Sequence, residues 1–142
     1  MTMIQSIIGT AILGLVSWPP STDPGGSVQS VPGDSQPGFW KRRYNYYFAD
    51  DIATLLAASS VSSVADTSFS FSENSANNFS IMWTGYFQAP STGSWKFKTA
   101  SDDASYFWIG SDALTGSSVF NCNINNGGLH GLTGVESPNP VH

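Results

Sequence analysis

The stretch that decides the fold is residues 79–110, FSIMWTGYFQAPSTGSWKFKTASDDASYFWIG. Large apolar residues recur at every second position from Phe79 to Phe87, and again around Trp95 and Phe97, which is the spacing of half-buried β-strands. The loop APSTG at 89–93 carries the Pro and Gly of a hairpin connection. Residues 105–110 are apolar on both faces, as in a central strand. The stretch therefore predicts three β-strands in succession.

The rest of the chain adds weaker signals of the same kind. Residues 67–72 alternate, with Phe69 and Phe71 facing inward, and residues 44–48 form a short aromatic run. Asp is a good helix N-cap, so the Asp pair at 50–51 predicts one or two helical turns over residues 50–57. We expect Ile52, Leu55 and Leu56 to share the buried face of that helix. Turns at intervals of about ten residues favour a β-sandwich or barrel.

The predicted fold is an all-β, antiparallel β-sandwich with one short helix. We expect its core to hold five aromatic residues from the three strands: Trp83, Phe87, Trp95, Phe97 and Trp108. At 142 residues the chain fits one domain with a core of ordinary size.

The N-terminal region divides into two parts. Residues 1–18 are apolar but lack the basic start and the cleavage site of a signal peptide, and they are short for a transmembrane helix. They are either a strand or assembly segment, or a signal-like or membrane segment; the first interpretation places them extended, apart from the sandwich or against a partner chain. Residues 19–38 are a Pro/Gly/Ser linker. We assign the sandwich to residues 39–142.

Composition excludes several classes of function. Charged residues are only 11% of the chain and the net charge is −5, so one basic cluster at 41–43 does not make a nucleic-acid-binding face. A membrane partner is not expected either. Cys122 is the only cysteine, so neither an intrachain disulfide nor a thiolate metal cluster can form. No Ser-His-Asp set is visible, and adjacent carboxylates are too close for a glycosidase pair, so we do not expect an enzyme.

Asp102 and Asp103 are the best candidates for a functional site. Successive side chains of a regular strand point to opposite faces, so the two carboxylates converge only if the backbone leaves strand geometry, as at a cis peptide bond. A divalent cation would then relieve their repulsion, and an oxygen-only ligand set favours Ca²⁺. Further oxygens are available in the Asn-rich run 121–126. The alternative is that the two aspartates only form a turn.

A family resemblance supports the first alternative. The run TGYFQAPSTGSWKFKTASDDASYFWIGSDA resembles the PA14 superfamily, particularly its GLEYA-like branch, over about residues 39–132. The shared pattern is a Gly-Tyr-Phe strand, a Pro-x-Thr-Gly turn, an aromatic strand, Ser-Asp-Asp and a Trp-Ile-Gly strand. The chain is also similar to PA14-type domains in structural proteins of tailed phages.

The resemblance implies a β-sandwich that binds glycans through Ca²⁺. It carries the calcium pair onto Asp102 and Asp103, with Asn125 or Asn126 of NNGGLHG as a further ligand, and Asp102, Asp103 and Asn126 would also meet the sugar. Tyr106 or Trp108 would stack on the sugar ring, or else pack in the core.

The chain departs from this family in its C-terminal part, because it ends at ESPNPVH where the family sandwich continues through further strands. Either the chain is a fragment, or another chain supplies the strand, as in strand donation or a homo-oligomer. Two functions remain open. One is a calcium-dependent glycan-binding adhesion module, extracellular or on a virion surface. The other is a structural or assembly component of a phage virion or surface filament that binds no sugar.

Overall fold

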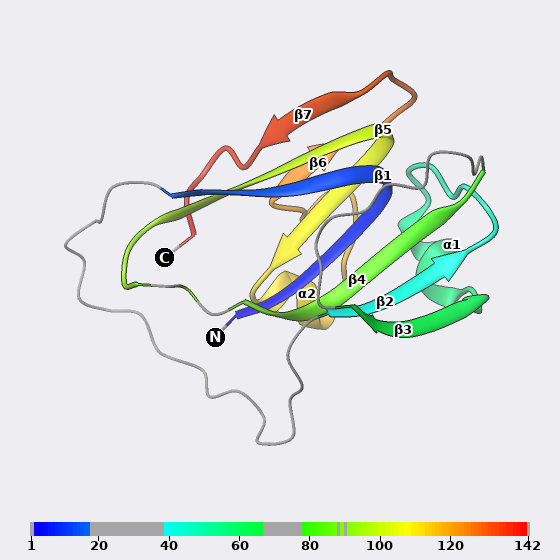
Figure 1. The fold of residues 1–142 in the computed structure, drawn as a ribbon, viewed down its shortest axis with the longest axis horizontal. Coiled ribbons are helices and arrows are strands. Elements are labelled where there is room, and N and C mark those ends of the chain that lie inside the picture. The colour runs from blue at the N-terminus through cyan, green and yellow to red at the C-terminus, as the bar shows by residue number, and fades with distance from the viewer. Residues whose placement is uncertain (1, 18–38, 67–77, 88, 90, 142) are drawn as a thin grey trace.

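A computed structural model of the chain describes residues 2–17, 39–66, 78–87, 89 and 91–141. Seven strands and two short helices make up this part (Figure 1). In chain order they are β1 (Thr2–Ser17), β2 (Phe39–Tyr44), α1 (Ile52–Ala57), β3 (Ser62–Asp66), β4 (Ser80–Phe87), β5 (Trp95–Ile109), α2 (Ser111–Thr115), β6 (Ile124–Asn126) and β7 (Thr133–Glu136). The prediction of an all-β protein is confirmed.

All strand pairs are antiparallel and belong to one hydrogen-bonded network. The order across it is β3-β2-β4-β1-β5-β6, and β7 pairs with the first part of β5. The run around Trp95 and Phe97 and the run 105–109, which we expected as separate strands, form the single long strand β5. Strands β2, β3, β6 and β7 carry no period-two signal strong enough for sequence reasoning, which missed all four.

A bend in the two long strands turns this network into a two-layered sandwich. Figure 1 shows β1 and β5 turning back at the same end of the molecule. The register between them shifts at that point: Ile8 pairs with Ser105, but Thr10 pairs with Asp102, so β5 holds one extra residue there. Beyond the bend β5 pairs with β6, and before it with β7. The Asp102–Asp103 pair therefore lies where the sheet folds over.

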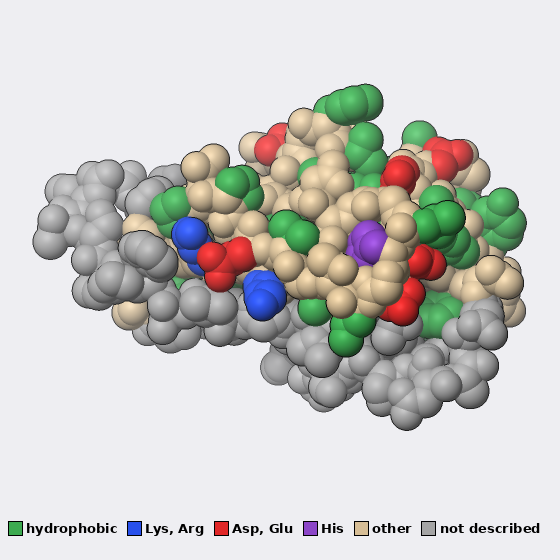
Figure 2. Space-filling view, turned by 90° about the horizontal axis from the view of Figure 1, so that it is seen from above, with side chains coloured by type: hydrophobic (Ala, Val, Ile, Leu, Met, Phe, Trp, Pro, Cys, Tyr) green, Lys and Arg blue, Asp and Glu red, His purple; other side chains and the backbone are tan. Residues whose placement is uncertain are grey.

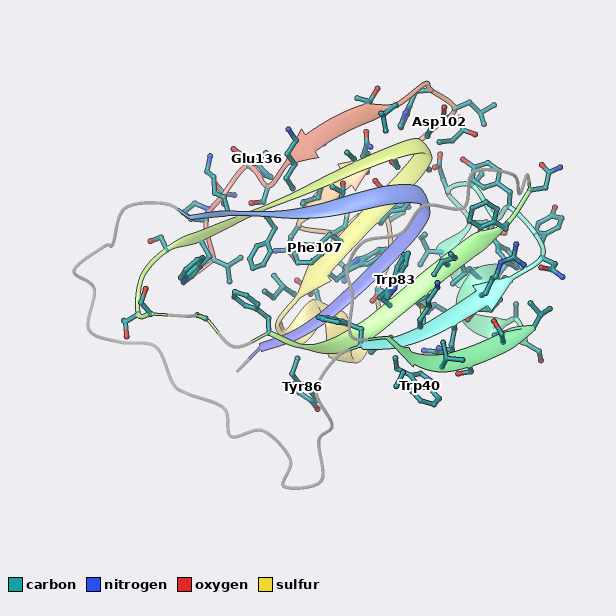
Figure 3. All side chains as sticks on the ribbon, viewed as in Figure 1. Trp40, Trp83, Tyr86, Asp102, Phe107 and Glu136 are labelled. Atoms are coloured by element: carbon teal, nitrogen blue, oxygen red, sulfur yellow. The ribbon has the colours of Figure 1, made fainter. Side chains whose placement is uncertain are left out.

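The two faces of β4 and β5 bury different cores, as period-two alternation requires. One core lies between the layers, where Figure 3 shows Trp83 and Phe107, and it also contains Phe97 and Ile109. The other lies under the helices and contains the alternate residues Met82, Tyr106 and Trp108, together with Tyr44, Ile52, Leu55, Ala104 and Ala113.

A buried polar cluster fills the inside of the bend. The hydroxyl of Ser101 donates to that of Ser105 at 2.7 Å, and Ser105 donates to Thr99 at 3.1 Å. The amide nitrogen of Asn126 donates to Ser101 at 2.9 Å and to the carbonyl of Thr133 at 3.1 Å. Small hydroxyl side chains let the two halves of β5 approach, and their mutual hydrogen bonds offset the cost of burying them.

The expectation that residues 1–18 lie apart from the sandwich is wrong. Thr2–Ser17 is extended, as expected of a strand, but it pairs with β4 over Thr2–Ile8 and with β5 over Ile4–Ser17. The chain itself thus supplies a central strand. The expected linker 19–38 and the expected strand 67–72 lie outside the described residues.

The predicted helix is confirmed as α1. The carboxylate of Asp51 caps it by accepting from the backbone N–H of Thr54 at 3.1 Å. Ile52 and Leu55 are buried, but Leu56 is 40% exposed, because a helix of six residues presents only a narrow face to the core. Among the five predicted core aromatics, Trp83, Phe97 and Trp108 are buried, whereas Phe87 and Trp95 are half-buried at the open end of the layers.

Candidate functional site

Asp102 and Asp103 lie next to each other at the bend of β5, where Figure 3 labels Asp102. The peptide bond between them is cis, which breaks the strand alternation at this position. Asp102 is exposed and Asp103 is half-buried, while their neighbours Ser101 and Ala104 are buried. The pair therefore projects outward from a fixed backbone.

Tyr47 lies beside the pair. Its hydroxyl oxygen accepts a hydrogen bond from the backbone N–H of Ala104 at 3.3 Å. Burial raises the pKa of Tyr47, and the negative charges of Asp103, Asp50 and Asp102 raise it further. The Tyr47 phenol is therefore the neighbour of the pair on the side of the 44–48 segment.

The loop after β6 folds over the pair and is held there by its backbone. The N–H of His130 donates to Oδ1 of Asp103 at 3.0 Å. The His130 ring lies between two carbonyls, with Nδ1 2.9 Å from the oxygen of Gly131 and Nε2 3.2 Å from that of Asn126. These two carbonyls raise the pKa of His130, and Asp103 and Asp102 add to the shift. In Figure 2 the histidine side chain lies beside acidic side chains.

Asp50 is a residue of this site that sequence reasoning missed, because the Asp-Asp pair at 50–51 was read only as a helix start. Its Oδ1 accepts from the Tyr106 hydroxyl and from the backbone N–H of Gly128, the latter at 3.0 Å. Burial raises the pKa of Tyr106, and the hydrogen bond to Asp50 raises it further. Asp50 thus connects the loop to β5. Asp50 and Gly128 are 78 positions apart, so no local sequence pattern predicts their contact.

Asn126 is linked to the segment of the pair through Ser101, whereas no hydrogen bond joins Asn125 to the pair. Asn125 is exposed, and its side chain is engaged by the loop: Oδ1 accepts from the N–H of Gly127 at 3.0 Å. Asn126 is 5% exposed, and its amide nitrogen donates into the polar cluster in the bend. These contacts use the amide nitrogen of Asn126, and its amide oxygen Oδ1 makes none of them. Ser101, its partner, directly precedes Asp102.

Sugar stacking and core packing were the two alternatives for Trp108, and the structure shows core packing. Its side chain is fully buried, and its indole N–H donates to the carbonyl of Ser118 at 2.9 Å and to Oδ1 of Asn121 at 3.1 Å. Tyr106 is 2% exposed and stacks on Trp108, with ring centroids 5.8 Å apart. Both rings belong to the core under the helices, as period-two alternation from Phe107 requires.

The donor set suits a hard cation bound partly by water or ligand. Within the described residues, no group of three or more His, Cys, Asp or Glu side chains is placed to hold a metal. The side chains of Asp102, Asp103 and Asn126 could offer oxygen ligands only, which Ca²⁺ prefers and Zn²⁺ does not. Calcium takes about six to eight oxygens. Loop carbonyls, waters or hydroxyls would have to complete the shell.

Comparison with known proteins gives one family. Residues 79–137 match the GLEYA domain, and this region includes β4, β5, β6, β7 and the aspartate pair. GLEYA domains belong to the PA14-like lectins and are carbohydrate-binding domains of the adhesin type rather than enzymes. Neither the curated proteins nor the solved structures gave a match. No helix in the described ranges has the length and apolarity to cross a membrane.

Proposed function

We propose that this chain is a calcium-dependent carbohydrate-binding module that serves adhesion at an extracellular or virion surface. The observation that carries the proposal is the outward-facing Asp102–Asp103 pair beneath the 127–131 loop, inside the region similar to GLEYA domains. In this proposal the pair holds Ca²⁺, and vicinal hydroxyls of a sugar complete its shell.

The charges around the pair support a cation. No hydrogen bond or ion pair links the carboxylate of Asp102 to another residue that the structure describes, and Asp103 uses one oxygen on the His130 N–H. Two neighbouring carboxylates repel each other unless a positive charge lies between them. A divalent ion removes that repulsion and still exposes coordination positions to a ligand.

Asn126 is the better supported of the two amide ligands. Its nitrogen is already fixed by Ser101 and Thr133, so using its amide oxygen as a ligand would cost little further side-chain entropy. Asn125 would have to give up its bond with Gly127 to turn its oxygen toward the pair. We therefore assign the third ligand to Asn126.

The test uses calorimetry with Ca²⁺ on the full chain, followed by a glycan array with calcium or with chelator. The double variant Asp102→Asn/Asp103→Asn should bind Ca²⁺ at least about 100-fold more weakly and lose calcium-dependent glycan binding. Asp51→Asn is the matched control, because it makes the same chemical change at an exposed helix cap and should bind as the parent does.

A second comparison separates the two asparagines. Asn126→Asp keeps an oxygen ligand and Asn125→Ala leaves the assigned ligand in place, so both should retain calcium. Asn126→Ala should lose it, and circular dichroism must show that this variant still folds. Calcium binding that survives in folded Asn126→Ala and vanishes in Asn125→Ala would reverse the assignment.

The alternative is a structural or assembly component of a phage virion or surface filament. The strand β1 favours it, since an apolar segment that completes a sheet within one chain can also complete it between chains. Absence of calcium binding to the folded chain would eliminate the lectin proposal. Calcium binding without any glycan partner would favour a purely structural cation.

A further inference from the structure

The outer part of the 127–131 loop buries little apolar surface. Leu129 is 80% exposed, and a Cβ placed on Gly128 or Gly131 would have no neighbour within 4 Å. Burial of apolar surface, the main favourable term in folding, therefore contributes little at these three positions. Polar contacts must decide where this part of the loop lies.

Two carboxylates outside the loop accept hydrogen bonds from it, one on each side of Leu129. Oδ1 of Asp50 accepts from the N–H of Gly128 at 3.0 Å. Oδ1 of Asp103 accepts from the N–H of His130, also at 3.0 Å. Asp103 belongs to the candidate cation site, whereas Asp50 comes from the segment between β2 and α1. Asp50 is thus an anchor of the loop that does not belong to the aspartate pair.

The backbone around Asp50 holds this residue in a defined place. The N–H of Asp51 donates to the carbonyl of Phe48 at 3.0 Å, which closes a turn around Asp50. Within this turn Ala49 has a φ of 50°, in the left-handed region that an L side chain enters only at a cost. The Tyr106 hydroxyl donates to the Asp50 carboxylate and holds it from the side of β5. Backbone in a sparsely populated conformation that its surroundings hold in place is typical of functional sites.

Both hydrogen bonds to the Asp50 side chain use the same oxygen atom. Oδ1 accepts from the Tyr106 hydroxyl and from the Gly128 N–H, and no donor in the part of the chain that the structure describes is bonded to Oδ2. An amide in place of the carboxylate would keep an acceptor oxygen at the position of Oδ1 and lose only the charge. The variant Asp50→Asn therefore separates the hydrogen bonds of Asp50 from its negative charge.

We propose that Asp50 is a positioning residue: it holds the 127–131 loop over the aspartate pair before a cation arrives, and so slows the release of a bound cation. The proposal rests on the calcium site of the proposed function, but it gives Asp50 no part in coordinating the ion. A loop that is already ordered loses less conformational entropy on binding, so the bound state is favoured. The effect is carried by the hydrogen bonds of Asp50 and not by its charge.

Amide hydrogen exchange of the full chain in calcium-free buffer tests whether Asp50 holds the loop. Asp50 is exposed, so its variants should fold. Asp50→Ala should raise the exchange rate of the Gly128 amide about tenfold, because the acceptor of that N–H is lost, whereas Asp50→Asn should stay within about threefold of the parent. Asp51→Ala is the matched control. It removes the neighbouring carboxylate and weakens the cap of α1, but should leave the Gly128 amide unchanged.

Stopped-flow release of Ca²⁺ into a chelator tests the consequence for the site. Asp50→Ala should release Ca²⁺ about tenfold faster than the parent, Asp50→Asn within about threefold of it, and Asp51→Ala at the rate of the parent. Release from Asp50→Asn as fast as from Asp50→Ala would show that Asp50 acts by charge or by direct coordination, and would overturn the proposal. An unchanged Gly128 exchange rate in Asp50→Ala would overturn it as well.

The two measurements also separate this proposal from the function on which it rests. A parent chain that binds no Ca²⁺ would remove the proposed function, and the exchange rates of the Gly128 amide alone would then decide whether Asp50 holds the loop. A parent that binds Ca²⁺, with release rates that do not change in Asp50→Ala, would leave the proposed function in place and overturn the role of Asp50.

Discussion

Oδ1 of Asp103 accepts a hydrogen bond from the backbone N–H of His130 at 3.0 Å, and this contact joins the bend of β5 to the loop after β6. One carboxylate of the pair is therefore both a candidate cation ligand and an anchor of the loop above it. Asp102, by contrast, is exposed and makes no such contact with the loop. The two neighbours should respond differently to substitution.

The first prediction follows from this difference. In calcium-free buffer, Asp103→Ala should raise the hydrogen-exchange rate of the His130 amide by about tenfold, since an acceptor bonded to that N–H is lost. Asp103→Asn keeps an acceptor oxygen and should largely preserve the protection. Asp102→Ala is the control and should leave the His130 amide unchanged. Equal effects of Asp102→Ala and Asp103→Ala would show that the loop responds to charge alone.

A second prediction concerns β1. Deleting residues 1–17 should abolish cooperative unfolding, because β4 and β5 would both lose the strand between them and expose unpaired backbone groups. Circular dichroism and amide NMR dispersion would measure the loss. A synthetic peptide of residues 2–17, added in trans, should restore dispersion. A truncated chain with a native-like spectrum would contradict the central position of β1.

The third prediction rests on the close approach of Gly127 to Tyr106. A Cβ at Gly127 would lie 2.2 Å from the Tyr106 hydroxyl oxygen, whereas one at Gly131 would have no neighbour within 4 Å. Gly127→Ala should therefore lower the free energy of unfolding by about 1–3 kcal/mol, and Gly131→Ala should be close to neutral. Denaturant unfolding measures both. In a Tyr106→Phe background the cost of Gly127→Ala should fall, and an undiminished cost would point to another clash.

The fourth prediction is a pH dependence at the cap of α1. Hydrogen bonds with Thr54 lower the pKa of Asp51, so its contribution to stability is present above the unfolded pKa near 4 and is lost as pH falls through the lower folded pKa. Asp51→Ala should lower Tm by about 3 °C at pH 7. The deficit relative to the parent should shrink toward pH 2. Asn can cap the helix but does not titrate, so the Tm of Asp51→Asn should differ from that of Asp51→Ala at both pH values.

The local pattern of the sequence determined the strands on either side of the aspartates and the capped helix. Alternation from Phe79 to Phe87 and around Trp95 depends only on neighbouring residues, so it is readable without the fold. Because Asp102 and Asp103 are adjacent, their side chains can converge only if the backbone departs from strand geometry at this point. The cis peptide bond between them is such a departure.

Tertiary structure alone decided where β1 lies, which asparagine is buried, and that Asp50 joins the site. β1 pairs with residues about 70 to 105 positions away, and Asp50 bonds to Gly128, so both arrangements depend on long-range contacts that leave no local period. Trp108 has the residue type of a sugar-stacking side chain, yet its place on β5 buries it. Residue type and spacing define what a side chain is able to do. Its burial and its partners, which are set by pairing across the whole chain, decide whether it can do so.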